Sequence, residues 1–261
     1  MRSHQHTRLV ALVALAAFAG ACSDSSTGPG ALQPAELSQV LAELQPSSLI
    51  GALSSQISVA PVAGLSAPAP SSCSFDAASK SFVCPNVSVT GITVTRSFTL
   101  LDASGNAQSQ FDQATTAAVR LKSTFAGTVV SGSSTLTIDQ QQESTMSGLL
   151  TGVHVLDGTS LGHVKGTIGN GTTSTQIAST VATTFDKLVL PRSPTGADRF
   201  PASGSITVNN STTIGALPAV ATSATITFNG TSKVTVTITS NGHTTSCTVD
   251  LSAQSATLCT V

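Results

Sequence analysis

The segment KVTVTITSNGHTTSCTVD, residues 233–250, has the pattern of a β-hairpin. Valine and isoleucine alternate with threonine on the way to Asn241-Gly242, and Asn-Gly is the strongest short signal for a two-residue hairpin loop. A loop at these two residues fixes one register, in which Cys247 lies on the apolar face of the hairpin. The pairs predicted by this register are Val234 with Val249, Val236 with Cys247, and Ile238 with Thr245.

The composition extends this β pattern to the whole chain. The 261 residues include 77 serines and threonines, whereas 9% are charged and 3% aromatic, with no Trp or Tyr. Threonine and valine favour strands because their branched Cβ restricts χ1. The hydrophobic share of 40% is too high for a disordered chain. The net charge of −1 and the absence of a basic stripe argue against nucleic acid as a partner.

The N-terminus has the features of a signal peptide. Arg2 and Arg8 precede an apolar run from Leu9 to Ala19, and this run is shorter than the roughly 20 residues that a membrane-crossing helix needs. The sequence Ala19-Gly20-Ala21-Cys22 resembles the lipobox of bacterial lipoproteins. The resemblance covers only the leader and carries no information about the remainder of the chain.

This resemblance implies that residues 1–21 are removed as a signal peptide and that Cys22 is lipidated. Ser23, rather than Asp, follows the cysteine, which in that family implies transfer to the outer membrane. Two or more acyl chains would then attach the protein stably to the membrane surface. The alternative is ordinary cleavage after Ala21, which would export the same chain to the periplasm without lipid.

The remaining cysteines predict disulfides. In an exported protein, four cysteines besides Cys22 favour disulfides over metal or thiol chemistry. The segments CSFDAASKSFVC (73–84) and CTVDLSAQSATLC (247–259) resemble each other and suggest two stapled hairpins, each bridge contributing about 2–3 kcal/mol. We therefore expect the local bridges Cys73–Cys84 and Cys247–Cys259. A crossed pairing, Cys73–Cys259 with Cys84–Cys247, would instead join the two ends of the domain.

Composition divides the mature chain into four parts. Residues 22–33 are a polar tether broken by Gly and Pro. Residues 34–57 are a helical segment of one or two short helices, and Ala/Pro-rich residues 58–72 are a linker. Residues 73–261 are an antiparallel β domain. The helical prediction depends on the i, i+3, i+4, i+7 spacing of Leu37, Val40, Leu41 and Leu44.

The periodicity of the β domain predicts either an antiparallel β-sandwich or a strongly curved sheet, without distinguishing them. A turn at Ala78-Ser79 would place Phe75 opposite Phe82. In residues 87–100 the apolar positions change from odd to even numbers at Gly91, where we expect a bulge. We also expect hairpin turns at residues 102–108 and 157–160.

Three local patterns resemble chemical sites, and each has a better structural explanation. GTSLG (158–162) matches the nucleophile elbow at Ser160, with Asp157 and His163 beside it, but the following residues read as a strand and not the required helix. A turn at 157–160 would place His154 and His163 on one face, yet a zinc site needs three or four ligands. Asp102, Ser104 and Asn106 match a calcium loop incompletely. No catalytic, metal-binding or cofactor-binding residue is therefore predicted.

The sequence thus predicts a non-enzymatic, lipid-anchored cell-envelope protein whose disulfide-stapled β domain is a structural or binding module. Its membrane contact is through lipidated Cys22, and a protein or apolar ligand as partner is left open. The first alternative is a periplasmic carrier or chaperone of apolar ligands or lipids, similar in outline to lipoprotein-carrier folds, with residues 34–45 as a lid. The second alternative is a hydrolase or metal-dependent enzyme built on Ser160, His154 and His163.

Overall fold

The computed structural model describes residues 73–250 apart from 90, 170–172, 191–199 and 241. These residues form strands and turns, and they contain no helix. The strands are β1 (Ser74–Asp76), β2 (Ser81–Val89), β3 (Ile92–Asp102), β4 (Ala107–Gln108), β5 (Thr116–Ser131), β6 (Ser134–Ser147), β7 (His154–Gly169), β8 (Ser174–Leu190), β9 (Ser203–Ile214), β10 (Val220–Thr227), β11 (Lys233–Ser240) and β12 (His243–Asp250).

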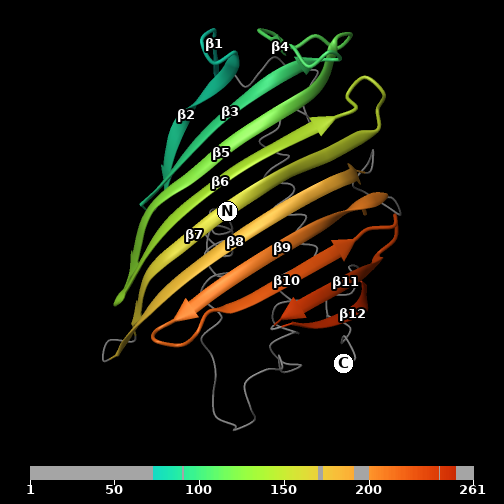
Figure 1. The fold of residues 1–261 in the computed structure, drawn as a ribbon. Coiled ribbons are helices and arrows are strands. Elements are labelled where there is room, and N and C mark those ends of the chain that lie inside the picture. Colours follow the sequence, from blue (N-terminus) through green and yellow to red (C-terminus); the bar gives the residue numbers. More distant parts are fainter. Residues whose placement is uncertain (1–72, 90, 170–172, 191–199, 241, 251–261) are drawn as a thin grey trace, which may run out of the picture.

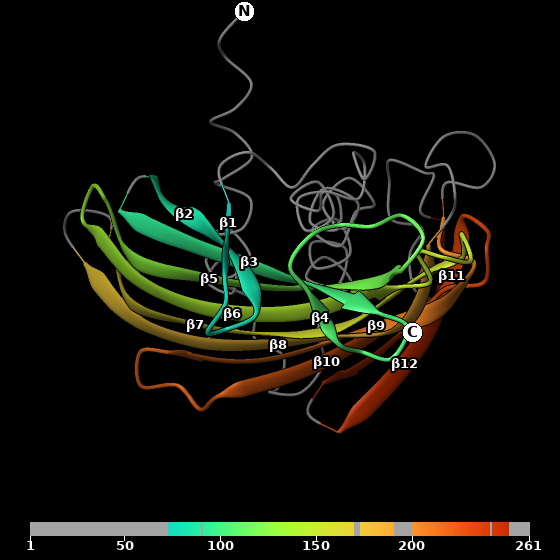
Figure 2. The same cartoon turned by 90° about the horizontal axis from the view of Figure 1, so that it is seen from above.

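All twelve strands belong to one antiparallel sheet in which neighbours in sequence are neighbours in space (Figure 1). The order is β1-β2-β3-β5-β6-β7-β8-β9-β10-β11-β12, and the short β4 pairs with β3. The longest strand, β8, has 17 residues, which at about 3.3 Å each span roughly 55 Å. Figure 2 shows that the sheet bends into a wide trough.

The prediction of a mainly β, antiparallel domain is therefore confirmed, and of the two predicted architectures the protein has the curved sheet. The described residues form one sheet instead of the two layers of a sandwich, and β1 and β12 are its two edges. The predicted helical segment 34–57, the tether 22–33, the linker 58–72 and Cys22 lie outside the described residues.

Two predicted registers are confirmed. In the β11–β12 hairpin, Val234 pairs with Val249, Val236 with Cys247 and Ile238 with Thr245. In the β1–β2 hairpin, Phe75 pairs with Phe82. Both registers follow from the length of the loop and from the alternation of apolar side chains, because a shift of one residue would turn every side chain to the other face.

Cys73 and Cys84 are joined by a disulfide, as the local pairing predicts, so the crossed pairing is wrong. The bridge lies beside a small aromatic stack in which Phe82 contacts Phe75 edge to face and lies parallel to Phe98 at a centroid distance of 4.7 Å. Cys247 is also disulfide-bonded. Its predicted partner, Cys259, lies outside the described residues, and that pairing stays a prediction.

The bulge predicted at Gly91 is wrong. Gly91 lies in the turn between β2 and β3, where Val89 pairs with Ile92, and its φ of +85° is one that glycine adopts without strain. The apolar positions change from odd to even numbers because the chain reverses there, and the paired residues Val87 and Val94 lie on the same face. The register irregularity lies instead between Cys84 and Val87, where Pro85 has no N–H for a ladder hydrogen bond.

The hairpin turn predicted at residues 157–160 is also wrong, because these residues lie inside β7. A Cβ on Gly158 would come within 2.7 Å of the Cα atom of Ser144 on β6, so this glycine allows two strands to approach closely. The expected turn at residues 102–108 is present, since Asp102 and Ala107 connect β3 to β4 through Gly105 with a φ of +81°.

The strand alternation gives the sheet two unlike faces. The apolar face, as we call it, carries Phe98, Ile138, Phe185, Ile206 and Val236, and the hydroxyl face carries mainly the Thr and Ser residues between them. Three clusters of buried side chains lie on the apolar face. Cluster 1 is centred on Leu188, Ile206 and Val234; cluster 2 on Phe82, Phe98, Leu100 and Val119; and cluster 3 on Ile92, Val94 and Ile138.

Gly127 on β5 tests how closely the backbone of β5 approaches the turn between β2 and β3. A Cβ there would lie 2.0 Å from the carbonyl oxygen of Gly91 and 2.8 Å from the Cα of Ile92, so Gly127→Ala should lower the free energy of unfolding by about 1–3 kcal/mol. At Gly162 a Cβ would meet nothing closer than 3.6 Å, so Gly162→Ala should be neutral or slightly stabilising. Urea unfolding measures both. Equal effects of the two substitutions would contradict the described approach of β5 to the β2–β3 turn.

Candidate functional site

The structure separates the residues of the apparent nucleophile elbow. Ser160 is buried on the apolar face, where its Oγ accepts a hydrogen bond from Gln140 Nε2 at 3.0 Å. His163 lies three residues further along β7 and is exposed on the hydroxyl face, with its Nδ1 3.1 Å from Thr180 Oγ1. Successive side chains of a strand alternate between faces, so the imidazole and the hydroxyl cannot meet. The hydrolase alternative therefore lacks the pair of residues on which it was built.

Asp157 and His154 have separate positions on β7. Asp157 Oδ1 accepts a hydrogen bond of 2.8 Å from the backbone N–H of Lys187, which has a φ of +46° beside the register shift between β7 and β8. The carboxylate thus stabilises an irregular point of the sheet. His154 and His163 are nine residues apart on one strand, roughly 30 Å, so the expectation that they share one face of a hairpin is wrong.

The calcium-like residues form a turn and not an ion site. Asp102 Oδ1 accepts hydrogen bonds from the backbone N–H groups of Ser104 and Asn106, and Oδ2 accepts one from the side-chain amide of Asn106. The hydrogen bonds from the Asn106 side chain and backbone lower the pKa of Asp102 below its ordinary 3.8. The carboxylate oxygens therefore already have protein donors, which explains the residue pattern without a metal.

A row of polar side chains crosses the apolar face. Arg96 on β3 pairs with Ser123 on β5, Ser123 with Gln142 on β6, Gln142 with Ser160 on β7, and Ser160 with Thr183 on β8. Directly paired residues of antiparallel strands lie on the same face, so this polar row is continuous over five strands. The apolar clusters 2 and 3 lie on either side of it along the strands, because Phe98 follows Arg96 and Val94 precedes it by two positions.

Two members of the polar row have polar groups without a partner. Gln142 is 6% exposed, and its Nε2 is buried without a hydrogen-bond acceptor. Arg96 is partly buried, and no carboxylate among the described residues forms an ion pair with it. A buried amide without an acceptor costs about 1–3 kcal/mol, so this arrangement weakens the core unless another group supplies the acceptor.

The hydroxyl face differs chemically from the polar row, because its hydroxyls bond to each other across strands. Thr95 and Thr124 are 2.6 Å apart at Oγ1, Thr207 and Thr225 3.1 Å, and Thr239 and Thr244 2.8 Å. One cross-strand row of this face runs from β3 to β12: Thr95, Thr124, Gln141, Leu161, Ala182, Asn209, Ser223, Thr239 and Thr244. The charges on it that form ion pairs centre on Glu143, which contacts Lys122 at 3.2 Å and Arg120 at 3.8 Å.

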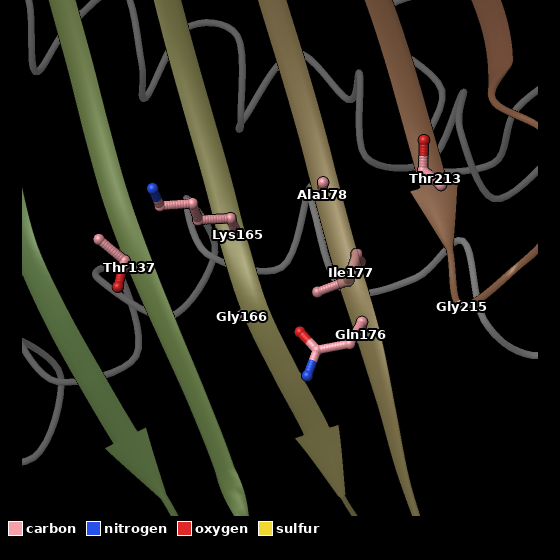
Figure 3. A pocket seen from close by; sticks show the side chains of 8 residues that line it. All are labelled: Thr137, Lys165, Gly166, Gln176, Ile177, Ala178, Thr213 and Gly215. Carbon is pink, nitrogen blue, oxygen red and sulfur yellow. The ribbon is translucent and has the colours of Figure 1, made fainter.

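A hollow of about 440 Å³ lies over β6 to β9 near one end of the sheet (Figure 3). Thr137, Lys165, Ala178 and Thr213 line it as one cross-strand row of the hydroxyl face, with Gln176 beside them. Its described lining has one cation and no carboxylate, so it contains neither an acid–base pair nor a set of metal ligands. Gln176 Nε2 is already bonded to Thr167 Oγ1.

The described residues also lack a cluster of metal ligands and a membrane-crossing helix. No group of three or more His, Cys, Asp and Glu side chains in the described ranges could hold a metal ion. Within the same ranges, no helix has the length and hydropathy to cross a membrane. Comparisons with protein-family models, with curated proteins and with solved structures find no match to this chain.

The polar row was missed by sequence reasoning because its members are distant in sequence and become neighbours only through the register. One local signal was available, since Gln142 occupies a position in QQQES where alternation from Ile138 to Met146 requires a core residue. The candidate functional surfaces of this molecule are therefore the polar row on the apolar face and the wide hydroxyl face.

Replacing the unpartnered amide tests the energetics of the polar row. Gln142→Leu keeps a similar volume and removes a buried donor that has no acceptor within the described sheet, so it should raise the free energy of unfolding by about 1 kcal/mol or more unless a group above the sheet accepts from that donor. Gln140→Leu, on the same strand and face, removes the donor to Ser160 and should lower it by about 1 kcal/mol. Urea unfolding of both variants gives the comparison. A loss of stability in Gln142→Leu would show that its amide has an acceptor in solution.

Proposed function

We propose that this protein is a non-enzymatic, lipid-anchored component of the cell envelope and that its β domain is a structural or binding module. The observation that carries the proposal is the hydroxyl face, a broad surface that crosses nine strands with paired hydroxyls and few ion pairs. Cross-strand hydrogen bonds fix the Thr and Ser hydroxyls of this face at regular spacing. These side chains would therefore lose little conformational entropy when a partner binds.

The exported location is supported by the disulfides and by the leader. Cys73–Cys84 and the bonded Cys247 fit an oxidising compartment, since structural disulfides are rare in the cytosol. The resemblance of Ala19–Cys22 to a lipobox supports cleavage, lipidation of Cys22 and, through Ser23, the outer membrane. Periplasmic export without lipid is the simpler alternative to this anchor.

Fractionation of cells tests the anchor. Cys22→Ala removes the only thiol that the lipobox resemblance assigns to lipid, so the protein should move from the membrane fraction to the soluble fraction and lose labelling by an alkyne fatty acid. Ser23→Asp keeps Cys22 and should remain membrane-bound, with a shift from the outer to the inner membrane. If Cys22→Ala leaves partitioning and labelling unchanged, the anchor is wrong.

A second candidate function is a carrier of apolar or amphiphilic ligands, and the polar row favours it. Arg96 and the unpartnered amide of Gln142 lie on a face that is otherwise apolar, an arrangement suited to the anionic head of a ligand whose chain contacts clusters 2 and 3. Ser160, which lies on the opposite face from His163 and accepts a hydrogen bond from Gln140, belongs to this polar row.

Displacement of a fluorescent fatty acid tests this second candidate. The mature chain should bind the probe saturably, and Arg96→Gln should weaken binding of the carboxylate form at least several-fold because it removes the only cation of the polar row. Arg120→Gln is the matched control, since Arg120 lies on the hydroxyl face beside Glu143. Absence of saturable binding, or equal weakening by both substitutions, would reject the carrier and leave the structural module.

A further inference from the structure

Cluster 3 is buried without any described second layer above it. Its buried members, Ile92, Val94 and Ile138, are 6–9% exposed, and the residues packed against them are Phe125, Val129 and Val164. All six belong to strands β3, β5, β6 and β7 of the same sheet. Strand neighbours lie beside a side chain and not above it, so one sheet cannot remove the tips of its own side chains from water.

The two other clusters are covered differently. Phe200 and Phe228 lie outside the strands and are buried in cluster 1, and Phe111 and Leu149 pack in the same way on cluster 2. These loop residues belong to one end of the strands, where Phe228 N donates to Gly204 O and Leu149 N to Ala117 O. Cluster 3 lies toward the other end, near Gly91 and Gly127, and none of the described loops packs on it.

Cys73, the described residue directly before β1, lies at the apolar face. Cys73 packs against cluster 2 on that face, and its bond to Cys84 fixes its position. Four strand steps separate β1 from β6, about 19 Å at 4.8 Å per step. The 15 residues of the linker, 58–72, can span up to about 50 Å, so the chain before them reaches cluster 3 with length to spare.

We propose that residues 34–57 of the same chain are the occupant of the apolar face over cluster 3 and the polar row. Leu37, Val40, Leu41 and Leu44 form one apolar stripe at helical spacing, which is the partner that an apolar sheet face requires. As a helix, the 12 residues before Pro46 would be about 18 Å long and could cross about four strands, the number that carry cluster 3. Carbonyl or side-chain oxygens of this segment would also offer acceptors to Gln142 Nε2.

Other occupants fit less well. Residues 251–261 follow β12, which the sheet order places five strands away from β7. A second copy of the chain would have to compete with a tethered segment, whose effective concentration is in the millimolar range for short linkers. The inference is independent of the membrane anchor, but it competes with the carrier function, because residues 34–57 and a ligand would occupy the same face.

Site-specific photo-cross-linking of the full chain in cells tests the proposal. Replacing Leu41 with p-benzoylphenylalanine should give cross-links within the same chain to apolar-face residues such as Val94, Ile138 and Val164. The matched control carries the same probe at Gln39, on the opposite side of the stripe, and should give at least several-fold less of this product. Peptide mass spectrometry identifies the linked residues.

A second measurement tests the same proposal without p-benzoylphenylalanine, in case this bulky residue disturbs folding. Leu41→Asp should increase binding of an apolar fluorescent dye several-fold, whereas Gln39→Asp should not, with strand content checked by far-ultraviolet circular dichroism. Cross-links between two chains, cross-links to the hydroxyl face, or equal yields at positions 39 and 41 would overturn the proposal. Unchanged membrane fractionation of Cys22→Ala, the result that would reject the membrane anchor, would leave this proposal standing.

Discussion

Hydrogen bonding between consecutive antiparallel strands is the constraint on which the rest of this molecule depends. Every strand from β1 to β12 is paired with its neighbour in sequence, β4 by way of β3, so one register at each hairpin determines which side chains share a face across the whole sheet. Clusters 1 to 3 and the polar row all follow from those registers. A shift of one residue at β6 would place Gln141 and Glu143 on the apolar face and expose Ile138, which is why the pairing is so strongly specified.

The same constraint explains how a chain so poor in aromatic residues forms a stable domain. The core is spread along a wide sheet and consists mostly of Val, Ile and Leu, with phenylalanines concentrated beside the Cys73–Cys84 bridge and at the loop-covered end of the strands. A bridge that closes a loop of this size contributes about 2–3 kcal/mol, a large fraction of the stability of an ordinary domain. On the other side of the sheet, threonine satisfies two demands, because its branched Cβ favours the strand and its hydroxyl bonds across to the next.

Local signals in the sequence were sufficient to predict the registers of two hairpins. They were insufficient to predict how the other strands pair in the sheet. The pairings Val234–Val249 and Phe75–Phe82 were predictable because each depends on a short loop and on alternation within a few residues. Gly91 and Gly158 were misread because glycine marks both turns and close approaches of backbone, and the sequence does not distinguish them. The polar row could not be predicted, since Arg96, Gln142 and Ser160 become neighbours only after three strand registers are fixed, those of β3–β5, β5–β6 and β6–β7.

A single sheet with two unlike faces also limits what the function can be. The hydroxyl face is already satisfied by bonds within the sheet, so it loses little by facing water and is free to meet a partner. The apolar face is not satisfied in this way, because burial over cluster 3 and the unpartnered amide of Gln142 both require atoms above the sheet. Whatever lies there must be apolar over most of its surface and must offer a hydrogen-bond acceptor near β6. A segment of the chain itself meets both requirements through its side chains and its backbone, and an amphiphilic ligand meets them through its chain and its head. The structural module and the carrier therefore differ in the occupant of one face and share the same sheet.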